Sequence, residues 1–192
     1  MFLKRDNPYL LVVGMTGVKM GDRMVQVGCG HGGRLGALAA IVGLSGRAAA
    51  VVPDESSAAR ARKGAAGAGV LVEVEVAPAT RLPLENGSFD LVVVDDTTGV
   101  LGSLCAEDRV ASVRELLRVL DPGGRVVLMG AAPRGGLGAL ISRAQSGPPW
   151  VASGEAVKAL EGDGFKPARM LAEREGLAFA EGIKPRTSRA NE

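Results

Sequence analysis

Two hydrophobic periodicities alternate along most of the chain. Short apolar runs, typical of strands buried on both faces of a sheet, occupy residues 24–27, 48–52, 89–94 and 125–130. Segments in which apolar residues recur at helical spacing lie at 34–42, 55–64 and 106–120. Because strands and helices alternate, the pattern predicts an α/β fold in which a parallel sheet carries helices on both faces.

The two ends of the chain show weaker signals. Asn7-Pro8 predicts the cap and first turn of a helix that runs to Met15. This helix would either pack on the sheet edge or form a lid over a ligand, with Tyr9 as its aromatic contact. Residues 164–173 and 177–184 predict a terminal hairpin, after helices at 137–144 and from Ser153 to Glu161.

Residues 70–76 alternate in part between apolar and acidic residues. This pattern predicts a strand near a sheet edge, with Glu73 and Glu75 on its wetter face. Residues 121–124, Asp-Pro-Gly-Gly, predict the end of the preceding helix.

The most informative stretch joins the first buried strand to the first long helix. Gly28, Gly30 and Gly33 fit the pattern G-x-G-x-x-G, at the turn where an open α/β sheet binds nucleotides. Glycines allow positive φ and let a ligand approach the main chain, and the following helix directs free N–H groups at that ligand. The alternative is a tight turn that binds nothing.

Length and composition narrow the classes of protein. The 192 residues predict one domain, 1–192, with an N-terminal helical segment at 1–20 and a frayed tail at 186–192. Aromatic residues make up only 3% and the net charge is +2, so a nucleic-acid partner is not expected. One histidine and two distant cysteines, Cys29 and Cys105, argue against a metal site. No apolar run is long enough to span a bilayer, and the N-terminus resembles a signal peptide poorly, so a cytoplasmic location is expected.

Three motifs in one order resemble class I S-adenosylmethionine-dependent methyltransferases. Val27-Gly28-Cys29-Gly30-His31-Gly32 is similar to the first motif of that family. Residues 81–92 resemble its L-P-F…G-S-F-D-x-V stretch, and residues 115–125 resemble its E-x-x-R-V-L-x-P-G-G segment. The resemblance covers about residues 20–185. It implies a Rossmann-like, open, seven-stranded and mostly parallel sheet with a reversed terminal strand.

The resemblance also implies a cofactor, S-adenosylmethionine, with S-adenosylhomocysteine as product, and a small-molecule acceptor. No catalytic residue transfers, since the family's displacement depends mainly on proximity and orientation. With no large inserted cap, the site would be open or completed by a second subunit or protein partner. The positions that match cofactor-binding positions of the family are Gly28, Cys29, Gly30, Gly32, Val52, Pro53, Ala79, Thr80 and Asp95.

Three acidic positions of the family are replaced here, by Gln26, Val52 and Pro78. Val52 stands where an acid normally accepts hydrogen bonds from the ribose, and Pro78 where one pairs with the adenine. Hydrogen bonds to a charged acceptor contribute about 1.5–3 kcal/mol each, so losing both would weaken cofactor binding by about 10²–10⁴-fold. Asp54 is the nearest carboxylate that could replace the first. The alternative function is a degenerate, methyltransferase-like binding module.

Several single residues carry two interpretations each. His31 is either an ordinary loop residue or a contact to a carboxylate or an acceptor. Of Asp95 and Asp96, one would cap a turn and the other would face the reaction centre. Trp150 is either an exposed lid or a packed anchor. A nicotinamide-dependent enzyme, suggested only by the glycine pattern, lacks the acid or arginine expected after the second strand.

Overall fold

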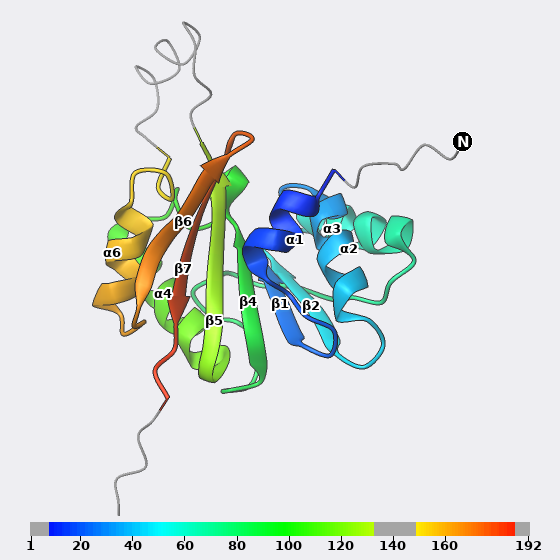
Figure 1. Ribbon diagram of the computed structural model, residues 1–192, viewed down its shortest axis with the longest axis horizontal. Coiled ribbons are helices and arrows are strands. Elements are labelled where there is room, and N and C mark those ends of the chain that lie inside the picture. The colour runs from blue at the N-terminus through cyan, green and yellow to red at the C-terminus, as the bar shows by residue number, and fades with distance from the viewer. Residues whose placement is uncertain (1–7, 133–148, 187–192) are drawn as a thin grey trace, which may run out of the picture.

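Seven strands form one sheet in the order β3-β2-β1-β4-β5-β7-β6 (Figure 1). The computed structural model describes residues 8–132 and 149–186. The strands are β1 (Arg23–Val27), β2 (Arg47–Val52), β3 (Glu73–Val76), β4 (Phe89–Asp95), β5 (Leu120–Ala131), β6 (Ala168–Arg174) and β7 (Leu177–Ile183). β7 runs antiparallel to both β5 and β6, and the remaining pairs are parallel. The predicted α/β class and reversed terminal strand are confirmed.

Helices cover both faces of this sheet, as Figure 1 shows. α1 (Leu10–Thr16), α2 (Gly32–Val42) and α3 (Glu55–Ala68) lie on one face, and α4 (Ala106–Val119) and α6 (Glu155–Gly162) lie on the other. A 3₁₀ turn, η1 (Asp96–Thr98), follows β4. No helix within the described ranges is long and apolar enough to cross a membrane.

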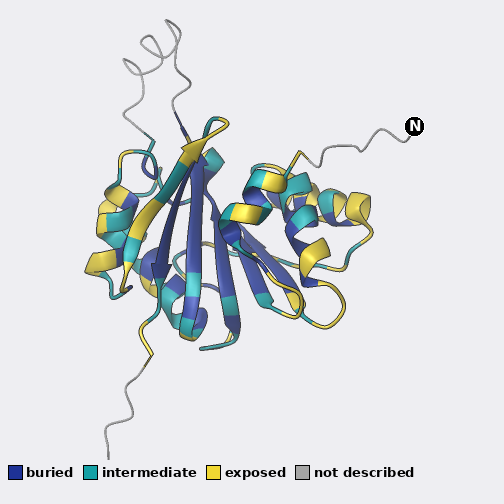
Figure 2. Cartoon of the chain, in the orientation of Figure 1, coloured by how far each residue is buried: buried dark blue, intermediate teal, exposed yellow. Residues whose placement is uncertain are grey.

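Each face of the sheet has its own hydrophobic core, because successive strand side chains point to opposite sides. In β1, Val25 and Val27 pack with α4 and α6, whereas Met24 packs with α1 and α2. Most residues of the central strands are therefore buried, and Figure 2 shows these strands largely in dark blue. This double burial explains the unbroken apolar run of β4.

Two helices are longer than the sequence predicts. α2 begins at Gly32 rather than Arg34, because the His31 side chain accepts a hydrogen bond from the Gly33 N–H and caps the helix. α3 continues about one turn past Gly64 to Ala68. It ends where Gly69 adopts a left-handed conformation with φ of 68°.

The largest difference in a strand boundary concerns β5. The predicted strand starts at residue 125, but β5 begins at Leu120 because Leu120 pairs with Phe89 of β4. The Pro-Gly-Gly turn is absorbed as an irregularity of the strand, with φ of 86° at Gly123. The Gly123 N–H also donates to the carbonyl of Lys184. Tertiary contacts therefore extend β5 toward its N-terminus, through the residues that end the preceding helix.

The remaining predictions have mixed outcomes. β3 is an edge strand with Glu73 and Glu75 exposed, as predicted, but it starts three residues later than the alternating pattern does. β6 begins at Ala168 rather than residue 164, because the preceding Phe165 is fully buried in the core. The first helix begins at Leu10 with Tyr9 as its cap.

α6 begins at Glu155, where Ser153 Oγ accepts from the Glu155 N–H. The proposed cap Asn7, the helix at 137–144 and most of the tail lie outside the described residues.

Candidate functional site

The glycine loop follows β1 at the carboxyl edge of the sheet. Gly28 has φ of 79°, a left-handed conformation that glycine adopts without strain. A Cβ at this position would lie 2.8 Å from the carbonyl oxygen of Asp95. The loop therefore needs glycine here both for its backbone angle and for its close approach to the end of β4.

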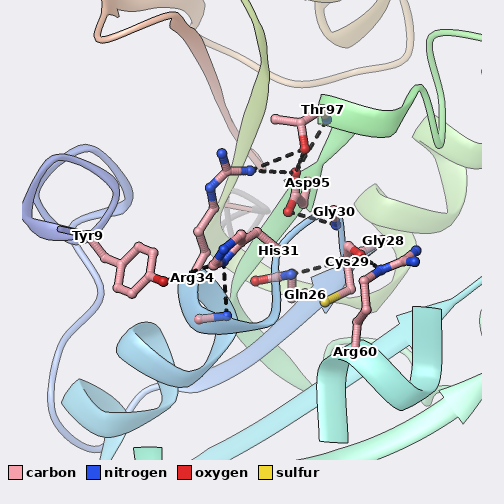
Figure 3. A network of polar contacts seen from close by, with 11 residues as sticks. Tyr9, Gln26, Gly28, Cys29, Gly30, His31, Arg34, Arg60, Asp95 and Thr97 are labelled. Atoms are coloured by element: carbon pink, nitrogen blue, oxygen red, sulfur yellow. Dashed lines mark hydrogen bonds and ion pairs between the residues drawn. The ribbon is translucent and has the colours of Figure 1, made fainter. Parts of the chain in front are cut away.

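Asp95 fastens this loop to β4. Its fully buried carboxylate accepts from the Gly30 N–H at 3.0 Å and from Thr97 Oγ1 at 2.5 Å. Arg34 Nη1 lies 3.4 Å from the same carboxylate and donates to Thr97 Oγ1 at 3.2 Å (Figure 3). Both carboxylate oxygens are therefore engaged by protein donors, and Asp95 positions the loop. A direct contact between Asp95 and a cofactor stays a prediction.

His31 lies at the tip of the loop. Its Nδ1 accepts from the Gly33 N–H at 3.2 Å and is 3.4 Å from the Tyr9 hydroxyl. Because Nδ1 accepts a backbone N–H, its lone pair is occupied and the ring proton is on Nε2. With Nδ1 used in this way, the far edge of the His31 ring carries the Nε2–H as a hydrogen-bond donor.

Beneath the loop, Gln26 replaces an acid of the family pattern. Its Nε2 donates to the Gly28 carbonyl at 2.9 Å, so the amide braces the loop from below. Within the described ranges, the buried Oε1 has no hydrogen-bond partner. An amide can donate to this carbonyl, which a carboxylate could not do.

Arg60 reaches the loop from α3. Its Nε donates to the Cys29 carbonyl at 3.1 Å, and its Nη2 donates to Ser57 Oγ at 2.8 Å. The Cys29 thiol beneath is buried, and this burial raises its pKa to about 11. A thiol with that pKa is protonated at neutral pH, so Cys29 fits a packing role and not a nucleophile.

The end of β2 contrasts with the loop. Val52 is fully buried and Pro53 is exposed, so neither brings a polar side chain to the site. Asp54 Oδ1 caps α3 by accepting from the Ser57 N–H at 2.8 Å, and it also accepts from Ser56 Oγ. These hydrogen bonds lower the pKa of Asp54, which keeps it ionised.

The segment after β3 brings equally little polar chemistry. Ala79 packs into the core on the α4 face, and Thr80 is half-buried beside it. No hydrogen bond of the Thr80 side chain is found among the described residues. At the positions that the family pattern predicts for the adenine, only backbone groups and small side chains are therefore available to a ligand.

Two cavities flank the glycine loop. A groove of about 620 Å³ runs between α2 and α3 and includes Gly30 and Gly32. A second cavity of about 500 Å³ lies between α1, the start of α2, Thr97 and the β6–β7 turn. The other seven predicted cofactor positions line neither cavity: Gly28, Cys29, Val52, Pro53, Ala79, Thr80 and Asp95.

The remaining candidates have structural environments. Asp96 accepts from the Leu101 and Gly102 N–H groups, and burial raises the pKa of its carboxyl. Trp150 is a packed anchor and not an exposed lid, since only 6% of it is exposed and Arg109 stacks on its ring. Cys105 is exposed.

Arg34, Arg60 and Thr97 are the contacts that sequence reasoning missed. A basic residue in the first turn of a helix opposes the helix dipole, so the position of Arg34 indicated that it needs an acidic partner. Its compensating partner, Asp95, is 61 residues away in the sequence and is brought near only by the pairing of β1 with β4.

Comparison with known proteins gives a consistent result. A family model described as a methyltransferase domain matches residues 25–128, more than half of the chain. Norajmaline N-methyltransferase of Rauvolfia serpentina is 30% identical over 119 residues, which are 60% of this chain and 38% of that protein. Methyltransferase GfsG of Streptomyces halstedii is 32% identical over 120 residues, 62% of this chain and 41% of that protein. The chain thus spans about two fifths of the length of these relatives.

Solved structures show the same fold. A methyltransferase from Aquifex aeolicus, described as SAM-dependent, superposes with a TM-score of 0.72 at 20% identity, over 93% of this chain and 89% of that chain. The [4+2]-cyclase SpnF superposes with a TM-score of 0.68 at 19% identity, over 92% and 79%. The glycine loop, the strand order and these matches together show that the chain belongs to the class I methyltransferase domain family, whose cofactor is S-adenosylmethionine.

Proposed function

We propose that this protein transfers the methyl group of S-adenosylmethionine to a small-molecule acceptor. The observation that carries the proposal is the glycine loop, held at the carboxyl edge of the sheet between β1 and α2. The first N–H groups of α2 have no intrahelical partners, and the helix dipole favours a carboxylate near them. Family membership supports the same conclusion.

The loop fits the amino-acid end of the cofactor. A Cβ on Gly30 would overlap Thr97 Oγ1, so glycine at this position lets the loop pack closely against η1. Gly28, Cys29, Gly30 and Gly32 would hold the cofactor through their main chain. When bound, the cofactor supplies an electrophilic methyl group on its sulfonium. The chain's contribution is to place an acceptor in line with it, an effect of several kcal/mol on the barrier.

The ribose end fits less well. Val52 provides no acceptor, and the carboxylate of Asp54 is committed through Oδ1 to the cap of α3. Pro78 has neither an acceptor side chain nor an N–H. We therefore expect cofactor affinity to be about 10²–10⁴-fold weaker than in a site with both acids.

This weakness favours a second candidate function, a binding module that has lost methyl transfer. The fold alone does not choose between the two, because the neighbour SpnF is described as a cyclase. Val52 and Pro78 are the observations behind this candidate.

Calorimetric titration with S-adenosylhomocysteine separates the two candidates. Methyl transfer requires binding, and we expect a dissociation constant in the micromolar to sub-millimolar range. Gly30→Val should abolish that binding, because its side chain would overlap Thr97, whereas Gly67→Ala, with nothing within 4 Å, should leave it unchanged. Absence of binding at millimolar ligand would favour the binding module. Tighter binding of NAD would instead point to a nicotinamide enzyme.

A further inference from the structure

The cavity of about 500 Å³ beside the glycine loop, here called the α1 cavity, differs from the groove between α2 and α3. It is lined by residues of α1, the glycine loop, η1, the end of β5 and the β6–β7 turn. Its volume is in the range of small-molecule sites. Val52, Pro53 and Ala79, which mark the predicted ribose and adenine side, do not line it. The α1 cavity is therefore placed for an acceptor and not for the nucleoside.

Arg34 and His31 are the polar lining residues that present N–H groups beside the glycine loop, and Tyr9 and Thr97 add hydroxyl groups. Arg34 Nη1 is held by Asp95 and Thr97, and the described residues provide no partner for Nε or Nη2. An arginine edge with two adjacent N–H groups matches the two oxygens of a carboxylate. Arg34 is also rigid, because the buried Asp95 fixes its other edge.

His31 adds a donor at the same cavity. Its Nδ1 is occupied by the Gly33 N–H, so Nε2–H is the available polar group. Figure 3 shows His31 and Arg34 on the same side of the Asp95 carboxylate, facing away from Arg60. The acceptor atoms of this network, on Asp95, Thr97 and His31, are already used within the protein.

Several of the other lining residues are apolar. Leu11 and Val12 of α1 form one wall, and Ala131 and Leu177 form another. Among the lining residues, the one free carboxylate belongs to Glu175, which is exposed on the β6–β7 turn. The cavity thus combines an apolar body with donor groups at the glycine loop.

We infer that the acceptor is a small carboxylic acid with an apolar skeleton, bound in the α1 cavity by Arg34 and the Nε2–H of His31. The term acceptor rests on the proposed function, whereas the ligand chemistry rests on the cavity alone. The carboxylate would anchor the acid next to the loop, and the skeleton would lie between α1 and β7.

The probes for the test are phenylacetate and its neutral counterpart phenylacetamide, which have the same shape. Each is titrated by calorimetry into the ligand-free protein and into protein saturated with S-adenosylhomocysteine. We expect phenylacetate to bind at least tenfold more tightly than phenylacetamide, because only the acid pairs with a guanidinium.

Variants then assign the contact. Arg34→Lys keeps a cation beside Asp95 but removes the two-donor edge, so the affinity for phenylacetate should fall about tenfold and that for phenylacetamide should not change. His31→Asn preserves a capping side chain, since asparagine caps helices well, and should reduce acid binding by a smaller factor. Arg62→Lys is the matched control, because Arg62 is exposed on α3 and pairs with Glu55 away from the cavity.

The single histidine gives an independent readout. In nitrogen-15 spectra, we expect the neutral form protonated at Nε2, and phenylacetate should shift the Nε2 signal without changing the tautomer. Equal binding of acid and amide, or an unchanged affinity for the acid in Arg34→Lys, would overturn the inference.

The cofactor also has a carboxylate, so a further arm separates the two sources. If Arg34→Lys weakens binding of S-adenosylhomocysteine but not of 5′-methylthioadenosine, Arg34 serves the cofactor and the acceptor assignment is wrong. If S-adenosylhomocysteine does not bind the wild-type protein, the proposed function fails. The titrations of ligand-free protein still decide the ligand class of the cavity.

Discussion

The two ends of the candidate site are built in opposite ways. At the glycine loop, Asp95, Gln26 and Arg60 hydrogen-bond to the backbone of Gly30, Gly28 and Cys29, and Arg34 contacts the Asp95 carboxylate. At the end of β2, Val52 is apolar, and the nearest carboxylate is committed to a helix cap. The loop end is thus held in place by polar side chains, whereas the β2 end has an apolar side chain and no carboxylate available to a ligand.

In the proposed function, this contrast separates the two ends of the cofactor. The methionine end, which carries the methyl group, would be positioned by the glycine loop, whereas Val52 would offer no carboxylate to the ribose. Removing an anchor of the loop should therefore weaken cofactor binding, whereas placing a carboxylate at the β2 end should strengthen it.

The largest effect is expected from Asp95→Ala. This change leaves Arg34 without its buried partner and frees the Gly30 N–H, and breaking such a buried pair costs about 3–5 kcal/mol. Urea unfolding measures the loss, and calorimetry should show that S-adenosylhomocysteine no longer binds. The control Glu55→Gln removes an exposed ion pair and should change the free energy of unfolding by less than about 1 kcal/mol. A stable Asp95→Ala protein with full affinity would show that the loop does not need this anchor.

A somewhat smaller effect is expected at the contact of α2 with α3. A Cβ on Gly64 would overlap the backbone of Gly32, where neither side can move aside, so Gly64→Ala should cost about 2–3 kcal/mol. Gly67→Ala, on the same helix with nothing within 4 Å, should instead stabilise by up to about 1 kcal/mol. Thermal and urea unfolding of the two variants should thus diverge in sign. Equal effects would argue against the close helix contact.

The third prediction concerns a carboxylate introduced at the end of β2. Val52→Asp should increase the affinity for S-adenosylhomocysteine about tenfold, because a carboxylate there can accept from the ribose hydroxyls. The same change should lower the stability of the ligand-free protein, since Val52 is fully buried. A 2′,3′-dideoxy analogue of the ligand is the control and should show no gain. A gain for both ligands would place the ribose elsewhere.

The smallest effect concerns the reactivity of the two cysteines. Burial raises the pKa of the Cys29 thiol to about 11, so only about one part in a thousand is thiolate at pH 8, and the thiolate fraction increases as the pH rises. Iodoacetamide should therefore label the exposed Cys105 first, as mass spectrometry of the two peptides would show. Rapid labelling of Cys29 in the native protein would mean that the loop opens readily.

Local sequence patterns were sufficient for much of the fold. The apolar run of β4 and the helical spacing of α4 identified their elements to within a residue, since burial on two faces and on one face leave distinct periodicities. Boundaries decided by distant partners were not predicted. β5 starts five residues early because Leu120 pairs with Phe89, and no local pattern records that pairing.

The sequence by itself determined the class of fold, the glycine loop and its resemblance to methyltransferases, because these depend on local periodicity and on a contiguous motif. Only the tertiary structure decided how the loop is used. Arg34, Asp95 and Arg60 come from separate elements, and parallel strand pairing brings them together at one sheet edge. Among the described residues, their contacts also leave one edge of Arg34 open. Such properties depend on three-dimensional proximity, which spacing along the chain does not encode.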